Sequence, residues 1–204
     1  MKDWFQIFIS ELKNISWLEW TGVSFGIAEV LFAKANKIWL YPAGIIAVII
    51  SSYLFIISGL YAESVLNLYY LAMSIYGWWH WMYKRNSIPL AISRASKKEW
   101  LITLLIVVAG LVILYLCLLH FTNSTVPLMD AWISATAWAG MWLLAKRKIE
   151  NWILLNISNV FAIPLLFYKQ LPLYALLTAF LFIVAVFGYF DWLKILKRTN
   201  ETGN

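Results

Sequence analysis

Apolar residues fill seven stretches of the chain, and short polar segments separate them. A helix needs roughly 20 residues, with about 1.5 Å of rise each, to cross a hydrocarbon core of about 30 Å. Each stretch approaches that length, so the pattern predicts seven membrane-spanning helices. They are expected at residues 17–34, 38–59, 62–83, 99–121, 127–146, 150–168 and 171–193.

Several connections between these stretches are only a few residues long. Turns of that length join helices that are antiparallel neighbours in space. The short connections are Lys34 to Lys37, Ser58 to Tyr61, Thr122 to Thr125 and Lys169 to Pro172. The pattern therefore predicts an all-α integral membrane protein in which sequential helices pack against each other.

The chain contains an internal repeat. Residues 38–85 and 151–198 are apolar stretches of equal length that superpose without a gap at an offset of 113, with Trp39 on Trp152 and Lys-Arg ending both copies. The matching charged ends predict that both copies cross the membrane in the same direction. Two three-helix units can share one orientation only if a single helix joins them. The prediction is a 3+1+3 arrangement of parallel repeats.

The Lys and Arg residues predict the orientation. Thirteen of the 16 follow the first, third, fifth and seventh stretches, and only Lys2, Lys13 and Lys169 lie on the other side. Cytoplasmic loops are enriched in these residues, so the C-terminus is expected in the cytoplasm and the N-terminus outside. The expected segments are an outer N-terminal segment at 1–16, a first three-helix repeat at 17–83, a cytoplasmic loop and linker helix at 84–126, a second three-helix repeat at 127–194 and a cytoplasmic tail at 195–204.

Composition agrees with a membrane location. Hydrophobic residues make up 63% of the 204 residues and charged residues 13%, whereas soluble domains have roughly half and about a quarter. The net charge of +6 lies in the short loops and not on one polar face. The expected counter-charge is therefore the anionic headgroups of the lipid bilayer, and no nucleic-acid partner is expected.

Motifs for other kinds of chemistry are missing from the sequence. It has no GxxxxGK[ST] loop and no GxSxG elbow. His80 and His120 lie near opposite ends of different stretches without cysteine companions, and Cys117 is the only cysteine. We therefore expect no cofactor, no metal site and no enzymatic activity.

Three amides are the first candidates for binding a solute. Each has an apolar counterpart at the offset of 113: Asn67 with Phe180, Asn156 with Ala43 and Asn159 with Ile46. A polar residue with an apolar counterpart is not required by a repeated scaffold, and polar groups at membrane depth are often functional. The alternative is that these amides only bond across packed helices.

Helical spacing extends these amides into two stripes. The predicted substrate-binding residues are Asn67, Tyr70, Ser74, Trp138, Trp142, Trp152, Asn156 and Asn159. The first three share one helix face and the last three share another, because they are three or four residues apart. Amides can bind hydroxyl and carboxamide groups, and aromatic rings can hold a flat or cationic heterocycle. For Trp138 and Trp142, core packing is the alternative to binding a solute.

Glu29 and two prolines interrupt the apolar stretches. Glu29 is expected either to carry a proton in a symporter or to pair with Lys34 about one turn away. Pro42 and Pro164 each remove a backbone hydrogen bond and bend a helix, so we predict hinges there that gate the two exits. A static kink is the alternative.

Three segments carry a resemblance to a known family. The runs Asn36–Gly44 and Tyr61–Trp81 and the later segment from Asp130 to Trp152 together resemble the PnuC family of vitamin transporters. The YY…SIYGW part of the second run is specific, and the resemblance spans about residues 17–194. It implies a bacterial inner-membrane protein with a seven-helix fold similar to the SWEET sugar transporters. It also implies facilitated diffusion, trapping of the imported vitamin by a cytoplasmic kinase, and a homotrimer.

Two positions bear on the substrate that the resemblance implies. Members that carry nicotinamide riboside usually have a second tryptophan where this chain has Leu155, which leaves the vitamin open. Thiamine-type members tend to have Asp where this chain has Asn159, which favours nicotinamide riboside. Nicotinamide riboside is the expected small-molecule substrate, with thiamine as the alternative and riboflavin or a nucleoside less favoured. A membrane receptor or scaffold that transports nothing is the competing class.

Overall fold

The computed structural model describes residues 4–58, 61–83, 91–122 and 124–202. Within these ranges the chain forms eight α-helices. They are α1 Trp4–Asn14, α2 Trp17–Lys34, α3 Leu40–Ile57, α4 Tyr61–Tyr83, α5 Lys97–Phe121, α6 Pro127–Ala145, α7 Asn151–Tyr168 and α8 Pro172–Thr202. The all-helical prediction is confirmed, and helices α2–α8 follow the seven predicted stretches closely.

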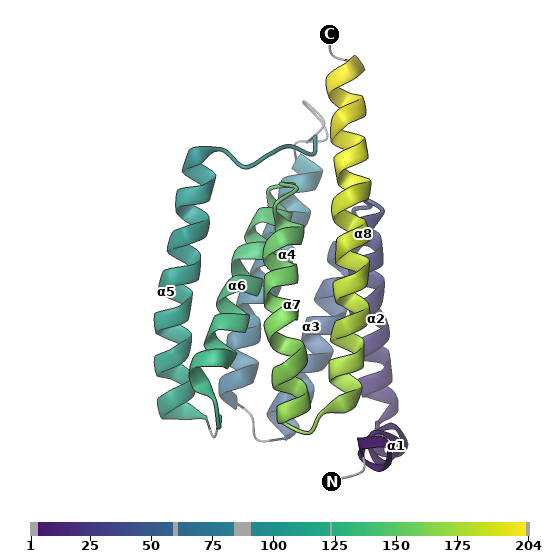
Figure 1. Cartoon of the computed structure of the whole chain (residues 1–204), viewed down its shortest axis with the longest axis vertical. Coiled ribbons are helices and arrows are strands. Elements are labelled where there is room, and N and C mark those ends of the chain that lie inside the picture. Colours follow the sequence, from purple (N-terminus) through teal and green to yellow (C-terminus); the bar gives the residue numbers. More distant parts are fainter. Residues whose placement is uncertain (1–3, 59–60, 84–90, 123, 203–204) are drawn as a thin grey trace.

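Two regions differ from the sequence prediction. Residues 4–14 form α1, which lies across the end of the bundle where the N-terminus is (Figure 1). This helix is too short to cross a bilayer. The pattern of long apolar stretches therefore did not predict it. At the other terminus, α8 continues to Thr202 and projects beyond the rest of the bundle (Figure 1), so most of the expected tail is helical.

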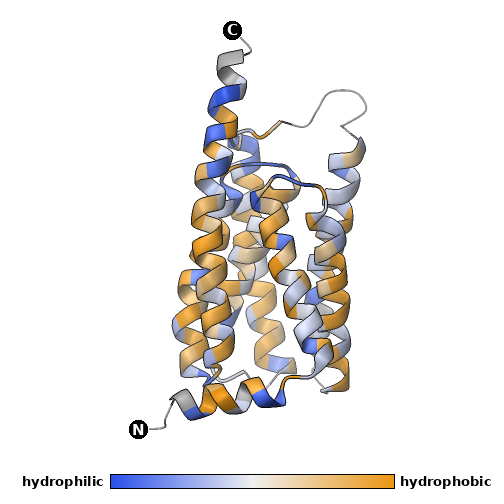
Figure 2. Ribbon diagram, turned by 90° about the vertical axis from the view of Figure 1, so that its right-hand side faces the viewer, coloured by the Kyte–Doolittle hydropathy of each residue, from blue (hydrophilic) through white to orange (hydrophobic). Residues whose placement is uncertain are grey.

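Helices α2–α8 run side by side along the long axis (Figure 1). Orange, the colour of apolar residues, dominates them between the two ends of the bundle (Figure 2). Four helices, α3, α5, α7 and α8, are long and apolar enough to cross a membrane, with mean hydropathies of 2.2, 3.0, 1.4 and 2.3. Large apolar side chains such as Leu101, Leu104 and Val108 are exposed along α5, as expected for a surface that faces lipid.

Capping interactions set where two helices begin. Ser16 accepts a bond from the Glu19 backbone N–H, and the Glu19 carboxylate accepts from the Ser16 N–H at 2.7 Å. The same capping box joins Ser96 and Glu99 at the start of α5. Glu19, which interrupts the first apolar stretch in the sequence, is therefore part of the signal that starts α2.

The helices pack as two groups of three. Helix α3 packs between α2 and α4, and these three helices form the first helix group. Helix α7 packs between α6 and α8, and these three form the second helix group. The groups meet where α2 contacts α8 and α4 contacts α6. Helix α5, which connects the groups, packs mainly on α6. Any passage between the groups is therefore lined by helices from both.

The turns inside the two groups correspond at a spacing of 111 residues. Asn36, with φ of 55°, and Arg147, with φ of 59°, occupy the left-handed position of the α2–α3 and α6–α7 turns. Leu40 begins α3 and Asn151 begins α7, again 111 apart. The offset of 113 predicted from sequence is wrong by two residues, because matched aromatic residues fixed it and turn geometry did not.

This change of register alters the comparison between the groups, because two residues correspond to more than half a helical turn. Asn67 now corresponds to Thr178, which is polar, so the argument that its counterpart is apolar no longer holds. Asn156 corresponds to Ile45 and Asn159 to Val48. The two amides of α7 thus keep apolar counterparts in the first group.

Candidate substrate site

A row of residues on α4 faces α3 and contains a buried, unpartnered hydroxyl. Tyr70, Ser74 and Gly77 lie on one face of α4 because they are three or four residues apart. Ser74 is completely buried, and its Oγ has no hydrogen-bond partner among the described residues. Tyr41 of α3 packs so closely on Gly77 that a Cβ there would lie 2.6 Å from the tyrosine hydroxyl oxygen. Its hydroxyl is likewise buried and unpartnered in the described structure.

Each helix group contains the same pair of perpendicular aromatic rings. In the first group, Tyr41 and Trp81 meet edge to face with ring centroids 5.2 Å apart. In the second, Trp152 and Trp192 do so at 5.6 Å, and Trp152 packs on Gly188 as Tyr41 packs on Gly77. Trp152, a predicted site residue, is therefore mainly a core residue, and only its unpartnered Nε1 is available for a ligand.

Tyr69 links the two helix groups, although the sequence pattern did not select it. Its ring stacks on Trp138 of α6 with centroids 4.3 Å apart, and its hydroxyl donates to the Trp138 carbonyl at 2.9 Å. The Trp138 Nε1 is buried without a partner in the described part of the chain. Helical spacing predicts Tyr70, and not Tyr69, as a site residue. The two adjacent tyrosines are the sequence feature from which Tyr69 could have been predicted.

One α7 amide, Asn156, lies beside a cavity of about 440 Å³ between α7 and α8. Asn156 lines it together with Trp152 and Tyr189, and the remaining lining is apolar. The Asn156 Oδ1 is buried and has no partner within the described structure. Asn159, one turn further along α7, is partly buried, as is Asn67 on α4.

The other predicted site residues separate into different surroundings. Trp142 packs on a hydrophobic cluster that contains Ala139, Leu143 and Leu154, which agrees with the core-packing alternative for this residue. Trp138, by contrast, lies at the α4–α6 contact. Trp138 therefore lies at the contact between the groups, and Tyr70 adjoins it through Tyr69. Ser74 is buried within the first group, and Trp142 packs in the second group's core.

The two prolines occupy different kinds of position. Pro164 lies inside α7, where its ring removes an intrahelical hydrogen bond. Pro42 lies in the first turn of α3, which begins at Leu40, and backbone N–H groups of a first turn have no intrahelical partner to lose. The physical reason for a hinge at Pro42 is therefore absent, because the sequence prediction began this helix two residues too early.

Polar contacts tie the two groups together at the C-terminal end of the bundle. The Arg147 guanidinium donates twice to the Asn36 Oδ1, at 2.9 and 2.7 Å, and lies 4.2 Å from the centre of the Trp81 ring. Trp81 Nε1 donates to the Ala145 carbonyl at 3.2 Å, and Trp192 Nε1 donates to the Ala33 carbonyl at 3.0 Å. Burial lowers the pKa of Arg147, and Tyr41 opposes that shift. We call these contacts the inner clasp.

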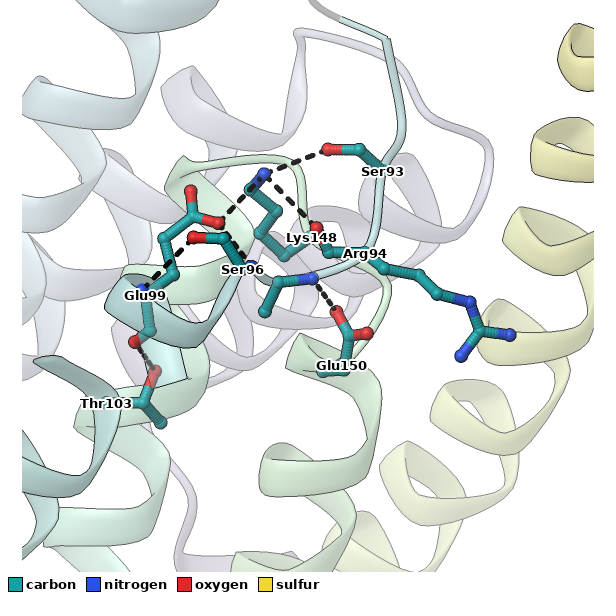
Figure 3. A network of polar contacts seen from close by, with 8 residues as sticks. Ser93, Arg94, Ser96, Glu99, Thr103, Lys148 and Glu150 are labelled. Atoms are coloured by element: carbon teal, nitrogen blue, oxygen red, sulfur yellow. Dashed lines mark hydrogen bonds and ion pairs between the residues drawn. The ribbon is translucent and has the colours of Figure 1, made fainter. Parts of the chain in front are cut away.

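The segment before α5 is fastened to the α6–α7 turn beside the clasp (Figure 3). Lys148 Nζ donates to the Ser93 Oγ at 3.0 Å and pairs with Glu99 at 3.1 Å. The Glu150 carboxylate accepts from the Ala95 backbone N–H at 2.9 Å. This network fixes the segment before α5 to the second helix group.

A multi-pass helical bundle whose two halves both hold buried polar groups without partners among the described residues has the features of a small-solute membrane transporter. The sequence profile of the family described as nicotinamide mononucleotide transporter matches residues 16–194. The chain belongs to this family.

Curated relatives and a solved structure agree with this assignment. The chain is 28% identical over 200 residues to the nicotinamide riboside transporter PnuC of Neisseria mucosa, an alignment that covers 90% of this chain and 74% of the relative. It is 23% identical to the PnuC of Escherichia coli, with 91% and 88% covered. The crystal structure of the vitamin B3 transporter PnuC superposes with a TM-score of 0.71 at 26% identity, over 96% of this chain and 88% of that one.

Proposed function

We propose that this protein carries nicotinamide riboside across the bacterial inner membrane by facilitated diffusion. Its relatives in Neisseria mucosa and Escherichia coli are nicotinamide riboside transporters. The observation that carries the proposal is that both helix groups contain buried polar atoms with no hydrogen-bond partner among the described residues, including Tyr41 Oη, Ser74 Oγ, Trp138 Nε1, Trp152 Nε1 and Asn156 Oδ1. Burying such atoms unpaired costs free energy, which a bound polar solute would recover.

The finer architecture belongs to the same proposal. Turns, helix starts, glycines and aromatic pairs recur at a spacing of 111, which supports two parallel three-helix repeats joined by α5, as in a seven-helix SWEET-like fold. The excess of Lys and Arg at the end of the bundle that carries the C-terminus supports a cytoplasmic C-terminus and an outer N-terminus. A homotrimer, and trapping by a cytoplasmic kinase, follow from the family resemblance.

The geometry supports a simple transport cycle. The inner clasp joins the two groups at the end that we propose to be cytoplasmic, so in the proposed cycle a solute reaches the polar groups from the other side. Release then requires the Arg147–Asn36 contact and the tryptophan bonds to separate while the groups rock about their contacts. The proline inside α7, Pro164, is placed to bend the second group during this motion.

The chemistry of the ligand fits the residues available. A nicotinamide ring can stack on an aromatic side chain, and its carboxamide and ribose hydroxyls can exchange hydrogen bonds with Asn156, Asn159 and Ser74. Thiamine is the second candidate because Leu155 stands where nicotinamide riboside carriers usually have tryptophan. Leu155 packs on Gly140, where a Cβ would come within 2.9 Å of its side chain, so the chain has built a close apolar contact at this position.

Binding titrations on the purified protein test the proposal. Calorimetry with nicotinamide riboside, thiamine, riboflavin and uridine in parallel should give saturable binding of nicotinamide riboside and much weaker binding of the others. Tighter binding of thiamine would transfer the assignment to the second candidate. Binding of none of the four would favour a receptor or scaffold for some other ligand and contradict the proposal.

A further inference from the structure

Glu29 of α2 carries a carboxylate within the bundle, and the space for it is left by a glycine of the neighbouring helix α3. Its side chain lies against Gly44 of α3: a Cβ at Gly44 would come within 2.5 Å of the Glu29 Oε1 and 2.6 Å of its Cδ. A residue larger than glycine at this position would force the carboxylate to move.

No positive side chain neutralises this carboxylate within the described residues. Lys34, the expected partner, instead forms an ion pair with Asp191 of α8 at 3.7 Å, which corrects the pairing predicted from sequence. The electrostatic neighbours of Glu29 are the phenols of Tyr41 and Tyr70. An uncompensated carboxylate at membrane depth is costly, and such residues usually mark a ligand or ion pathway.

The second helix group shows that the scaffold does not need the charge. At the spacing of 111, Glu29 corresponds to Gly140 and Gly44 corresponds to Leu155. Leu155 packs on Gly140 just as Glu29 packs on Gly44, with the large and small residues exchanged between the helices. A leucine fills the gap in one group and a glutamate fills it in the other. Packing accounts for a large side chain at this place, but not for a charged one.

The surroundings of Glu29 connect it to the contact between the groups. Tyr70 interacts electrostatically with Glu29 and with Tyr69, and Tyr69 stacks on Trp138 of the second group. We propose that the Glu29 carboxylate, seated on Gly44 beside Tyr70, supplies the negative charge that binds the positively charged ring of a cationic heterocyclic substrate. This inference rests on the proposed function and adds a charge-selecting residue to it.

A pair of ligands that differ mainly in charge tests the role of Glu29. Nicotinamide riboside carries a pyridinium ring, whereas its reduced 1,4-dihydropyridine form is neutral and has nearly the same size. In the full-length protein, Glu29→Gln should weaken binding of the cationic form at least tenfold and change binding of the neutral form less than twofold. Glu29→Asp, which keeps the charge, should retain a preference for the cation. Asp191→Asn removes a carboxylate at the bundle end and should alter neither ligand's binding.

The outcomes separate the inference from the proposed function. Equal weakening of both ligands by Glu29→Gln, or no change in either, would overturn the charge-selecting role while leaving transport intact. Failure of the unmodified protein to bind nicotinamide riboside would contradict the proposed function, and the inference with it. Gly44→Ala gives a second measure, because the added Cβ displaces the Glu29 carboxyl group without removing it. It should reduce the preference for the cation; an unchanged preference would contradict the role.

Discussion

The two helix groups share a backbone plan but differ in chemistry. Each has a left-handed turn residue, a pair of perpendicular aromatic rings, and a glycine on which one ring of the pair packs. The first group places a carboxylate, Glu29, where the second has an apolar contact between Gly140 and Leu155. The second instead carries the amides of α7. The two groups thus repeat several features of turn geometry and packing but differ in these polar residues. The first group has the Glu29 carboxylate and one amide, Asn67, whereas the second has the two amides of α7.

The shared scaffold should fail most severely where a ring lies on a glycine. A Cβ at Gly188 would lie 2.7 Å from the buried Trp152 ring, so Gly188→Ala should lower the free energy of unfolding by about 1–3 kcal/mol. Gly26→Ala is the matched control, since no atom lies within 4 Å of its Cβ position. Thermal unfolding in detergent would measure both. Equal melting temperatures would show that the aromatic pair does not hold the second group together.

The inner clasp should be the next most sensitive feature, because its hydrogen bonds and its cation–ring contact join the two groups. Arg147→Ala removes both hydrogen bonds to Asn36 and the contact with the Trp81 ring. It should destabilise the closed inner end by about 1–3 kcal/mol. Arg147→Lys keeps the positive charge and should destabilise the closed inner end less. In a Cys117→Ala background, a cysteine introduced by Ser74→Cys should react faster with a cytoplasmic thiol reagent when Arg147 is replaced by Ala. An unchanged labelling rate would mean that these contacts do not close the passage.

The amides should affect binding more than stability. Asn156→Ala should weaken binding of nicotinamide riboside roughly tenfold, or about 1.4 kcal/mol, because a ligand group would be left without its partner. Asn159→Ala should act in the same direction, and Asn67→Ala more weakly because its counterpart Thr178 is also polar. Titration and thermal unfolding of the same samples distinguish the roles. Lower stability with normal affinity in all three variants would make the amides helix contacts only.

The smallest expected effect concerns Pro42 of the first group and Pro164 of the second. Pro164→Ala should slow transport severalfold with little change in equilibrium binding, because it restores a backbone hydrogen bond inside α7. Pro42→Ala should leave turnover nearly unchanged, since a first-turn residue loses no such bond. Initial rates in proteoliposomes would test both. A larger effect at Pro42 than at Pro164 would reverse this difference between the groups.

Hydropathy and turn lengths were sufficient to predict helices α2–α8, because long apolar runs determine membrane helices. They could not reveal α1, whose few apolar residues form no such run. The repeat was visible in the sequence, but its register was not: the aromatic matches at 113 outweighed a turn geometry that becomes apparent only when Asn36 and Arg147 adopt the same left-handed conformation.

The candidate site was harder to predict for a related reason. Helical spacing identified the faces that carry Tyr70, Ser74 and Asn156, but contacts between helices are not encoded in spacing along one helix. Thus spacing does not reveal the stacking of Tyr69 on Trp138, and the Glu29–Lys34 pair that it allows as one alternative does not form, since Lys34 pairs with Asp191. The exchange of large and small residues between Glu29–Gly44 and Gly140–Leu155 emerges only after the register has been corrected.

Transport by the purified protein tests the central claim most directly. Liposomes that contain the protein should equilibrate radiolabelled nicotinamide riboside across the bilayer without ATP or an ion gradient, and a protonophore should have no effect. Uptake no faster than in protein-free liposomes would contradict the account, as would accumulation above the external concentration that collapses when the protonophore is added.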